Sequence, residues 1–261
     1  MWMLSVRKVL PVVVLVVGLL WSAVSLAAGP VYLVHDEAEP MEVLAGALRA
    51  VGHPTFVDEQ AAFADRLRET TPEAVFMYVH GDVEPGVEID LINYAAKGGR
   101  LIILHHGIAS AKVRSRRWLP FAGIAILPRD HPTHPWRVLR GNVRVVNLQP
   151  GHYVTTHNID YPETILYRPS DEPSTAQSLD GFTLADTEMF LNQHFTDGRR
   201  KTVLLGAQVE VDGETFAQDR AGWLMPAWQG HVFYFQQGHR AADYQNSTFV
   251  QILLNAVSWK P

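Results

Sequence analysis

Short apolar runs separated by helix-length segments characterise the first half of the chain. Apolar positions at helical spacing begin after Pro40 and end at Gly52, and a second helix is expected before Gly98. The apolar runs lack polar alternation, as is typical of parallel strands covered on both faces. The expected strands are 31–34, 55–57, 74–79 and 101–104. This alternation predicts an α/β fold with a doubly wound, mostly parallel sheet and helices on both faces.

The second half has a less regular pattern. Residues 128–173 are rich in Pro, His and Gly and contain one alternating strand at 143–146, which favours an insertion. Gln229-Gly230-His231 forms a hairpin turn signal, and Asn246 or Ser247 can cap a final helix. The strands expected here are 202–205, 223–228 and 232–235. Without an internal repeat, the pattern predicts one domain over residues 28–261.

The N-terminal residues have the layout of a secretory signal. Arg7 and Lys8 precede an apolar run over 9–20, and small residues provide a cleavage site ending at Ala27. We expect cleavage after Ala27, which would leave residues 28–261 as a periplasmic or secreted domain without a stable membrane anchor. The alternative is an uncleaved N-terminal anchor, because further apolar residues follow the run.

Composition restricts the available chemistry. The sequence contains no cysteine, which excludes a thiol nucleophile, a cysteine zinc site, an iron–sulfur cluster and a lipoprotein anchor. Its 22 basic and 27 acidic residues become 20 and 27 once Arg7 and Lys8 are removed, a formal charge of -7. That charge argues against nucleic acid as a partner. The 12 histidines are a high number for this length, so His, Asp and Glu are the candidate metal ligands.

Polar side chains follow several predicted strands at their carboxyl ends, where a doubly wound sheet binds its ligands. His105 and His106 come directly after strand 101–104. Because neighbouring side chains alternate in direction, one should point into the cleft and the other should pack beneath it. Both could instead be structural histidines bonded to backbone carbonyls. The other strand-end candidates are His35, Asp36, His80, Asp82, Gln236, Gln237, Gly238 and His239.

Two further groups carry weaker signals. His131 and His134 are spaced like metal ligands, but the prolines beside them favour a surface loop. Asp186, Glu188 and His194 lie close in sequence and could be ligands, acid–base groups or solvated loop residues. The sequence lacks a Gly-x-Ser-x-Gly elbow, a phosphate-binding glycine loop and a His-Glu-x-x-His helix, so serine hydrolases, nucleotide-binding proteins and zinc proteases lack their motifs here.

Three separated segments resemble the ThuA-like, trehalose-utilisation family. They are residues 98–107, residues 182–191 and a C-terminal block from Pro226-Ala227-Trp228 to Gly238-His239, with Asn246, Phe249 and Trp259 after it. The resemblance implies a flavodoxin-like sheet of the class I glutamine amidotransferase-like superfamily and a role in carbohydrate utilisation. One departure is the second histidine after the fourth strand, where the family usually has Gly-Leu-His. Amidotransferase activity itself is excluded because the cysteine nucleophile is absent.

These observations predict an exported enzyme, a hydrolase or other carbohydrate-active enzyme, that acts on a small-molecule sugar or glycoside. Its catalytic residues would be His105, His106, Glu188 and His239, acting by proton transfer. A divalent metal such as zinc could instead be held by His105 or His106 together with Glu188 and His239. The metal-free interpretation is favoured, because no His-x-His or His-x-x-x-His pair supports the metal.

The alternative function is a non-catalytic carbohydrate-binding module of the same fold. It would use exposed tryptophans as stacking faces for sugar rings. The candidates are Trp118, Trp136, Trp223 and Trp228. The sequence does not fix the oligomeric state.

Overall fold

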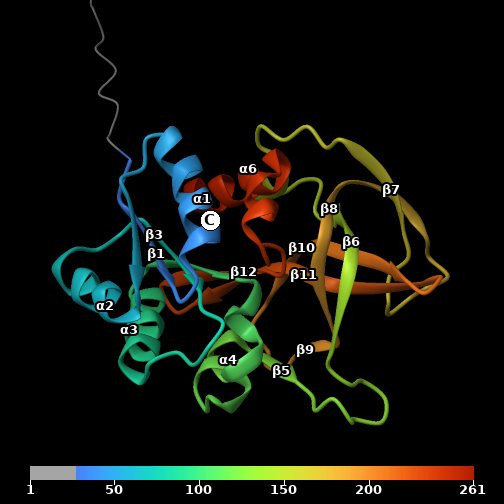
Figure 1. The fold of residues 1–261 in the computed structure, drawn as a ribbon, viewed down its shortest axis with the longest axis horizontal. Helices are drawn as coiled ribbons and strands as arrows, with labels where there is room; N and C mark the ends of the chain where they lie inside the picture. Colours follow the sequence, from blue (N-terminus) through green and yellow to red (C-terminus); the bar gives the residue numbers. More distant parts are fainter. Residues whose placement is uncertain (1–27) are drawn as a thin grey trace, which may run out of the picture.

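The computed structural model describes residues 28–261, so the predicted signal peptide at 1–27 lies outside the described residues (Figure 1). The main feature is one ten-stranded sheet in the order β2-β1-β3-β4-β12-β11-β10-β6-β8-β7. Helices cover both faces of its parallel half, which confirms the predicted doubly wound α/β class. Within residues 28–261, no helix is long and apolar enough to cross a membrane.

Five neighbouring strands form a parallel half of the sheet, in which the last strand of the chain, β12, pairs with β4. The strands are β1 (Val31–His35), β2 (Thr55–Glu59), β3 (Ala74–Tyr78), β4 (Arg100–Leu104) and β12 (Gly230–Phe235). The helices packed on this half are α1 (Ala38–Ala50), α2 (Gln60–Glu69), α3 (Pro85–Ala96), α4 (Trp118–Ala122) and α6 (Ser247–Ser258).

Side chains of the parallel strands alternate between two apolar cores. Leu33 and Phe76 face the core formed with α1 and α6, whereas Val34 and Met77 face the core formed with α2, α3 and α4. All four side chains are fully buried. Burial on both faces explains why these strands are uniformly apolar in the sequence.

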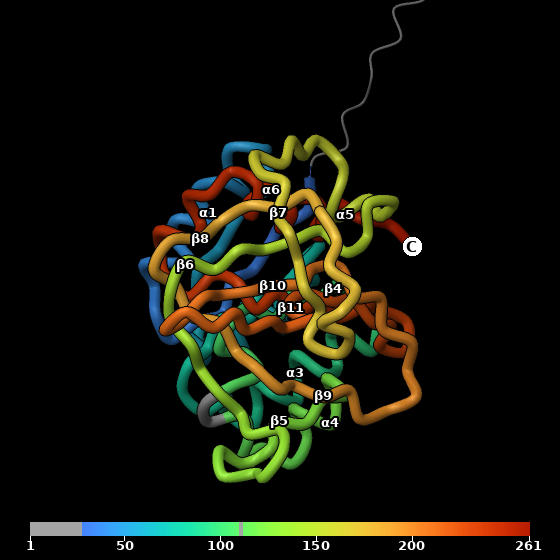
Figure 2. Tube along the Cα trace, turned by 90° about the vertical axis from the view of Figure 1, so that its right-hand side faces the viewer, coloured from blue at the N-terminus to red at the C-terminus, as the bar shows by residue number. Residues whose placement is uncertain are grey.

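The remaining strands form an antiparallel half that continues the same sheet (Figure 2). Its strands are β6 (Arg137–Asn147), β7 (Glu163–Tyr167), β8 (Gln177–Leu191), β10 (Thr202–Val211) and β11 (Glu214–Ala227). A separate two-stranded sheet pairs β5 (Ile124–Ile126) with β9 (Gln193–Phe195), and α5 (Tyr153–Thr156) follows β6.

The predicted insertion at 128–173 is therefore wrong as a description of this segment. It contributes β6, which lies between β10 and β8, and β7 at the edge of the sheet. The other C-terminal predictions hold: β11 and β12 form the expected hairpin, and the Asn246 side chain caps α6 by accepting a hydrogen bond from the Phe249 amide.

Candidate functional site

A sharp turn after β4 presents two histidines at the carboxyl end of the sheet. His105 begins the short helix η1 (His105–Ile108) with φ 35°, a left-handed conformation that is uncommon for a residue other than glycine. Gly107 follows where the chain passes against the sheet, and a Cβ there would lie 2.3 Å from Ile103 Cγ2. The turn buries both His105 and His106.

His239 lies in the loop after β12, and hydrogen bonds through Asp243 link this loop to β8, the strand that carries Glu188. The amide of His239 donates a hydrogen bond to Asp243 Oδ2 at 2.8 Å, and the hydroxyl of Thr187 donates to the same oxygen at 2.7 Å. Asp243 is buried in the short helix η3 (Ala241–Gln245). Asp243 therefore fixes His239 relative to Glu188, although the two belong to different segments.

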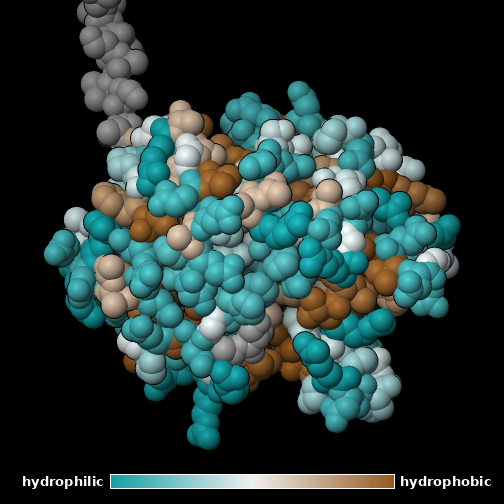
Figure 3. Space-filling model, in the orientation of Figure 1, coloured by the Kyte–Doolittle hydropathy of each residue, from teal (hydrophilic) through white to brown (hydrophobic). Residues whose placement is uncertain are grey.

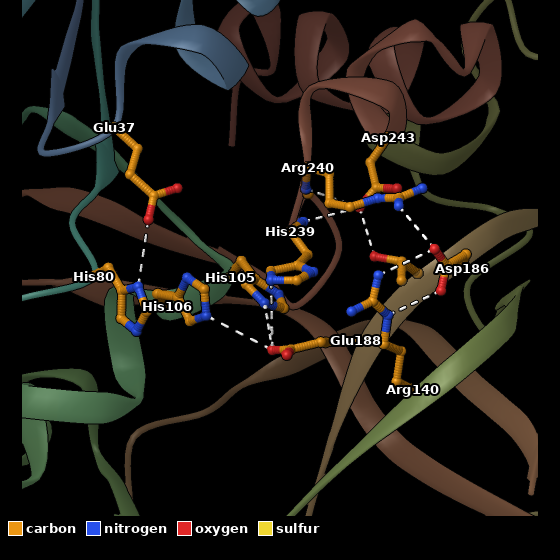
Figure 4. A network of polar contacts seen from close by, with 12 residues as sticks. Glu37, His80, His105, His106, Arg140, Asp186, Glu188, His239, Arg240 and Asp243 are labelled. Carbon is orange, nitrogen blue, oxygen red and sulfur yellow. Dashed lines mark hydrogen bonds and ion pairs between the residues drawn. The ribbon is translucent and has the colours of Figure 1, made fainter.

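Three imidazoles converge on one carboxylate (Figure 4). Glu188 Oε2 lies 3.6 Å from His105 Nε2 and 3.7 Å from the Nε2 atoms of both His106 and His239. One ligand atom from each of these four residues lies within 4.8 Å of all the others. The structure therefore brings together all four residues that the sequence singled out, from β4, β8 and β12.

The protonation states favour a set of neutral imidazoles around an anion. His105 Nδ1 lies 2.5 Å from the carbonyl oxygen of Gln236, so Nδ1 carries the proton and Nε2 presents its lone pair to the site. Burial lowers the pKa of His105 to about 4 and also lowers the pKa of His106. Glu188 is the anion of this set, and its Oε2 lies 3.6–3.7 Å from the three Nε2 atoms.

This donor set fits a divalent metal ion. His105 Nε2 is buried and has no hydrogen-bond partner among the described atoms, while its lone pair faces the Glu188 carboxylate. Two groups that both offer lone pairs repel unless a cation lies between them. Ligands at about 2.0–2.1 Å from a tetrahedral zinc lie about 3.4 Å apart, close to the three observed distances. The four residues could thus hold zinc or a similar metal.

A cleft of about 750 Å³ opens beside these four residues. His106, Glu188 and His239 line it, whereas His105 does not and lies beneath. This arrangement agrees with the predicted division of the two adjacent histidines. A metal held there would be reached from solvent on the side of Glu188.

Comparison with known proteins identifies the family to which this chain belongs. The family profile described as trehalose utilisation (ThuA) matches residues 28–260. The chain belongs to the ThuA family. No curated protein matches the sequence.

Solved structures similar to this ThuA-family chain share its fold at low sequence identity. A putative ThuA-like protein from Bacteroides uniformis is 14% identical and aligns over 87% of this chain and 89% of its own, with a TM-score of 0.57. The β-galactosidases from Bacillus circulans sp. alkalophilus and from Rahnella sp. R3 are each 12% identical, with TM-scores of 0.53 and 0.51. In both cases 87% of this chain aligns, but it spans only 30% and 32% of those enzymes.

Other strand-end residues of this ThuA-family protein support the ligand cluster. The His80 ring stacks on the His106 ring at 4.0 Å between centroids, with 7° between the planes. Asp36 accepts hydrogen bonds from the amides of His80 and Gly81, at 2.7 and 2.6 Å. Lys112 Nζ donates to the carbonyls of Val79, His80 and Gly81. Asp36 and Lys112 thus fix the turn that holds His80 against His106.

Lys112→Met is expected to lower the free energy of unfolding by roughly 1–3 kcal/mol, because buried carbonyls lose their donor. Burial lowers the pKa of Lys112 from 10.5 to about 7, against the opposing attraction of Asp36 and Asp82. Between these pH values the unfolded wild type binds more protons than the folded one, so its stability rises with pH relative to the variant. Urea unfolding measures the difference in the free energy of unfolding between wild type and Lys112→Met. This difference should be larger between pH 7 and 10.5 than below pH 7, and it should grow with pH.

The exposed Lys260→Met is the matched control, and its difference from wild type should not follow this pH dependence. A constant gap between Lys112→Met and wild type would show that Lys112 titrates like an ordinary surface lysine.

Asp243→Asn is expected to weaken zinc binding about 10-fold to 100-fold, as is typical when a residue that orients a ligand is changed. The variant replaces one acceptor of the Thr187 and His239 hydrogen bonds with a donor, which frees the His239 loop. Competition titration with a zinc chelator measures the effect. Asp219→Asn removes a comparable acceptor of the Tyr167 hydroxyl and should leave zinc affinity unchanged; equal affinities in all three proteins would contradict the role of Asp243.

Several sequence candidates lie outside the cluster. Asp186 is paired with Arg140 and Arg240, at 2.8 and 2.9 Å, and does not reach the imidazoles. His194 lies on β9, where its ring is 5.3 Å from that of His134. The remaining candidates are likewise outside the four-residue cluster: His35 and Gln237 are buried, Asp82 pairs with Arg114, and His131 packs near His134.

The tryptophans predicted to stack on sugar rings are mostly unsuited to that role. Trp118 and Trp223 are fully buried in the core, so neither ring can contact a ligand. Trp136 lines the cleft, and Trp228 is 73% exposed in the β11–β12 turn. Two of the four tryptophans proposed to stack on sugar rings in the binding-module alternative are therefore excluded.

Sequence reasoning missed the residues that shape the site without taking part in chemistry. Lys112 carries no signal of burial in the sequence, and Pro128 and Trp136, which line the cleft, fall within the segment predicted as an insertion. Asp243 is not among the residues that the sequence singles out. Its hydrogen bonds to Thr187 and His239 depend on the tertiary fold.

Proposed function

We propose that this protein is an enzyme that acts on a sugar or glycoside and uses a divalent metal held by His105, His106, Glu188 and His239. The observation that carries the proposal is the convergence of three Nε2 atoms on Glu188 Oε2 at 3.6–3.7 Å, beside an open cleft. The family description, trehalose utilisation, supports carbohydrate as the substrate class. We further propose that the protein acts in the periplasm or outside the cell, on the basis of the signal-like sequence at 1–27.

Each residue has a distinct part in the proposed chemistry. His105 is fixed by the Gln236 carbonyl and points its lone pair toward Glu188 from beneath the cleft. His106 is held in place by stacking on His80, and its Nε2 faces Glu188 from the cleft side. Glu188 and His239 line the cleft, where the second carboxylate oxygen of Glu188, Oε1, can accept a hydrogen bond from a substrate hydroxyl and take its proton. A divalent metal, when bound, would polarise a substrate oxygen or lower the pKa of a water molecule.

The metal-based proposal differs from the metal-free interpretation favoured by the sequence. The reason is the buried lone pair of His105 Nε2, which has no donor opposite it among the described residues. Proton transfer alone does not require a third imidazole beneath the cleft. A metal gives that buried nitrogen a partner.

Elemental analysis of the purified protein, combined with a panel of sugars and glycosides, tests the proposal. Wild type should contain stoichiometric divalent metal and turn over at least one compound. The His106→Ala, Glu188→Ala double variant should lose both while still unfolding cooperatively. Protein that is metal-free as purified and fully active in chelator would contradict the proposal that the enzyme uses a metal. Saturable sugar binding without product would favour the binding module instead.

A further inference from the structure

The residues that line the cleft beside the ligand cluster form two groups of different character, a polar wall and an apolar wall. The polar wall consists of His80, His106, Glu188 and His239. Apart from Arg129, the other side chains of the cleft are apolar; they include Val113, Ile126, Leu127, Pro128, Trp136 and Val138. In Figure 3, apolar surface is visible in the hollow beside the lobe that carries the β5–β6 loop. The polar and apolar walls therefore belong to one continuous cavity.

Part of the apolar wall is left in contact with water. Val113 is 47% exposed and Val138 is 38% exposed, and both lie at this cleft rather than on an unrelated surface. Water contact with such side chains is unfavourable, and clustering them in a cavity is typical of a surface that a ligand covers. Trp136 extends this surface inward, where its ring packs against Phe190 at 5.0 Å between centroids.

The apolar wall is poorly matched to the hydroxyls of a sugar. A hydroxyl that loses water without gaining a hydrogen bond costs free energy, and valine, isoleucine, leucine and proline side chains offer no partner. The imidazoles and carboxylate of the polar wall do offer partners. A molecule that fills both walls therefore needs hydroxyls at one end and apolar carbon at the other. The volume of about 750 Å³ accommodates a ligand of that size.

We propose that the substrate is a glycoside with an apolar aglycone, aromatic or alkyl, rather than a free sugar or a disaccharide. This inference rests on the proposed function, because it uses the same site. The glycosyl group lies against His106, Glu188 and His239. The aglycone lies against Val113, Trp136 and Val138. These apolar residues then determine specificity, while the residues of the polar wall carry out the reaction.

Calorimetry with phenyl and methyl D-glucopyranosides, each in both anomers, and with trehalose tests the inference on the protein as purified. The phenyl compound of the preferred anomer should bind at least about tenfold more tightly than the methyl compound or trehalose, because it covers more apolar area. The Val113→Ser, Val138→Ser double variant should lose this preference and retain its affinity for the methyl glucoside. Both residues are exposed, so the variant should remain folded.

Val51→Ser, which changes an exposed valine outside this cleft, is the matched control and should keep the phenyl preference. Equal binding of phenyl and methyl glucosides, or a preference unchanged by the double variant, overturns the apolar-aglycone inference and leaves the proposed function standing. Absence of both binding and turnover for every glycoside of the panel contradicts the proposed function, and the inference fails with it.

Discussion

Glu188→Gln is expected to lower turnover by a factor of about 10² to 10⁴. The amide has nearly the shape of the carboxylate but carries no charge and cannot accept a proton. It also removes the anion at 3.6–3.7 Å from three imidazole nitrogens, so metal should be lost from the purified protein. Turnover of the best compound in the panel, together with metal content, measures both effects.

Asp186→Asn is the matched control for Glu188→Gln. Asp186 lies on the same strand, but its carboxylate pairs with Arg140 and Arg240 rather than with the imidazoles. Exposed ion pairs contribute little, so the control should keep its metal and most of its turnover. Equal losses in both variants would show that charge near β8, rather than Glu188 itself, supports the site.

Gly107→Ala is expected to lower the free energy of unfolding by about 1–3 kcal/mol, as overpacking of a filled core does. The added Cβ would lie 2.3 Å from Ile103 Cγ2 and 2.9 Å from Met77 Sδ, so the turn after β4 must move. Because His106 directly precedes this glycine, zinc affinity should fall as well. Urea denaturation and metal titration report the two effects separately.

Gly46→Ala provides the control for adding a methyl group. Nothing lies within 4 Å of a Cβ at this position, which is on the exposed side of α1. Alanine in a helix should raise stability by roughly 0.5–1 kcal/mol. If Gly107→Ala also left the urea midpoint unchanged or raised it, the close packing at the β4 turn would not restrict the site.

The sequence predicted the parallel half of the sheet well and the antiparallel half poorly. Strands such as 74–79 are apolar throughout because both faces are covered, and that pattern has few alternatives. By contrast, β6 carries exposed charged residues and Gly141 and follows a proline-rich loop, so only its second half shows a strand pattern. Its position between β10 and β8 depends on pairings that local sequence does not specify.

The residues of the candidate site also divide into those that the sequence could predict and those that it could not. His105, His106 and His239 could be found because each follows a parallel strand, where ligands of this fold class bind. Glu188 lies within antiparallel β8, where that rule does not apply. Its position near Asp186 and His194 gives only a weak signal, which the family resemblance strengthens. The convergence of the four side chains, the burial of Lys112 and the apolar wall depend on tertiary packing and could not be read from spacing.

The placement of β12 has a consequence for how the chain folds. This strand comes last in the sequence but lies between β4 and β11, where the two halves of the sheet meet. Until residues 230–235 are available, the parallel and antiparallel halves have no shared strand, and His239 is still missing from the cluster. Such non-local pairing is associated with slow folding. Ordering of the cluster should therefore coincide with completion of the sheet, and uptake of the proposed metal would then report that final step.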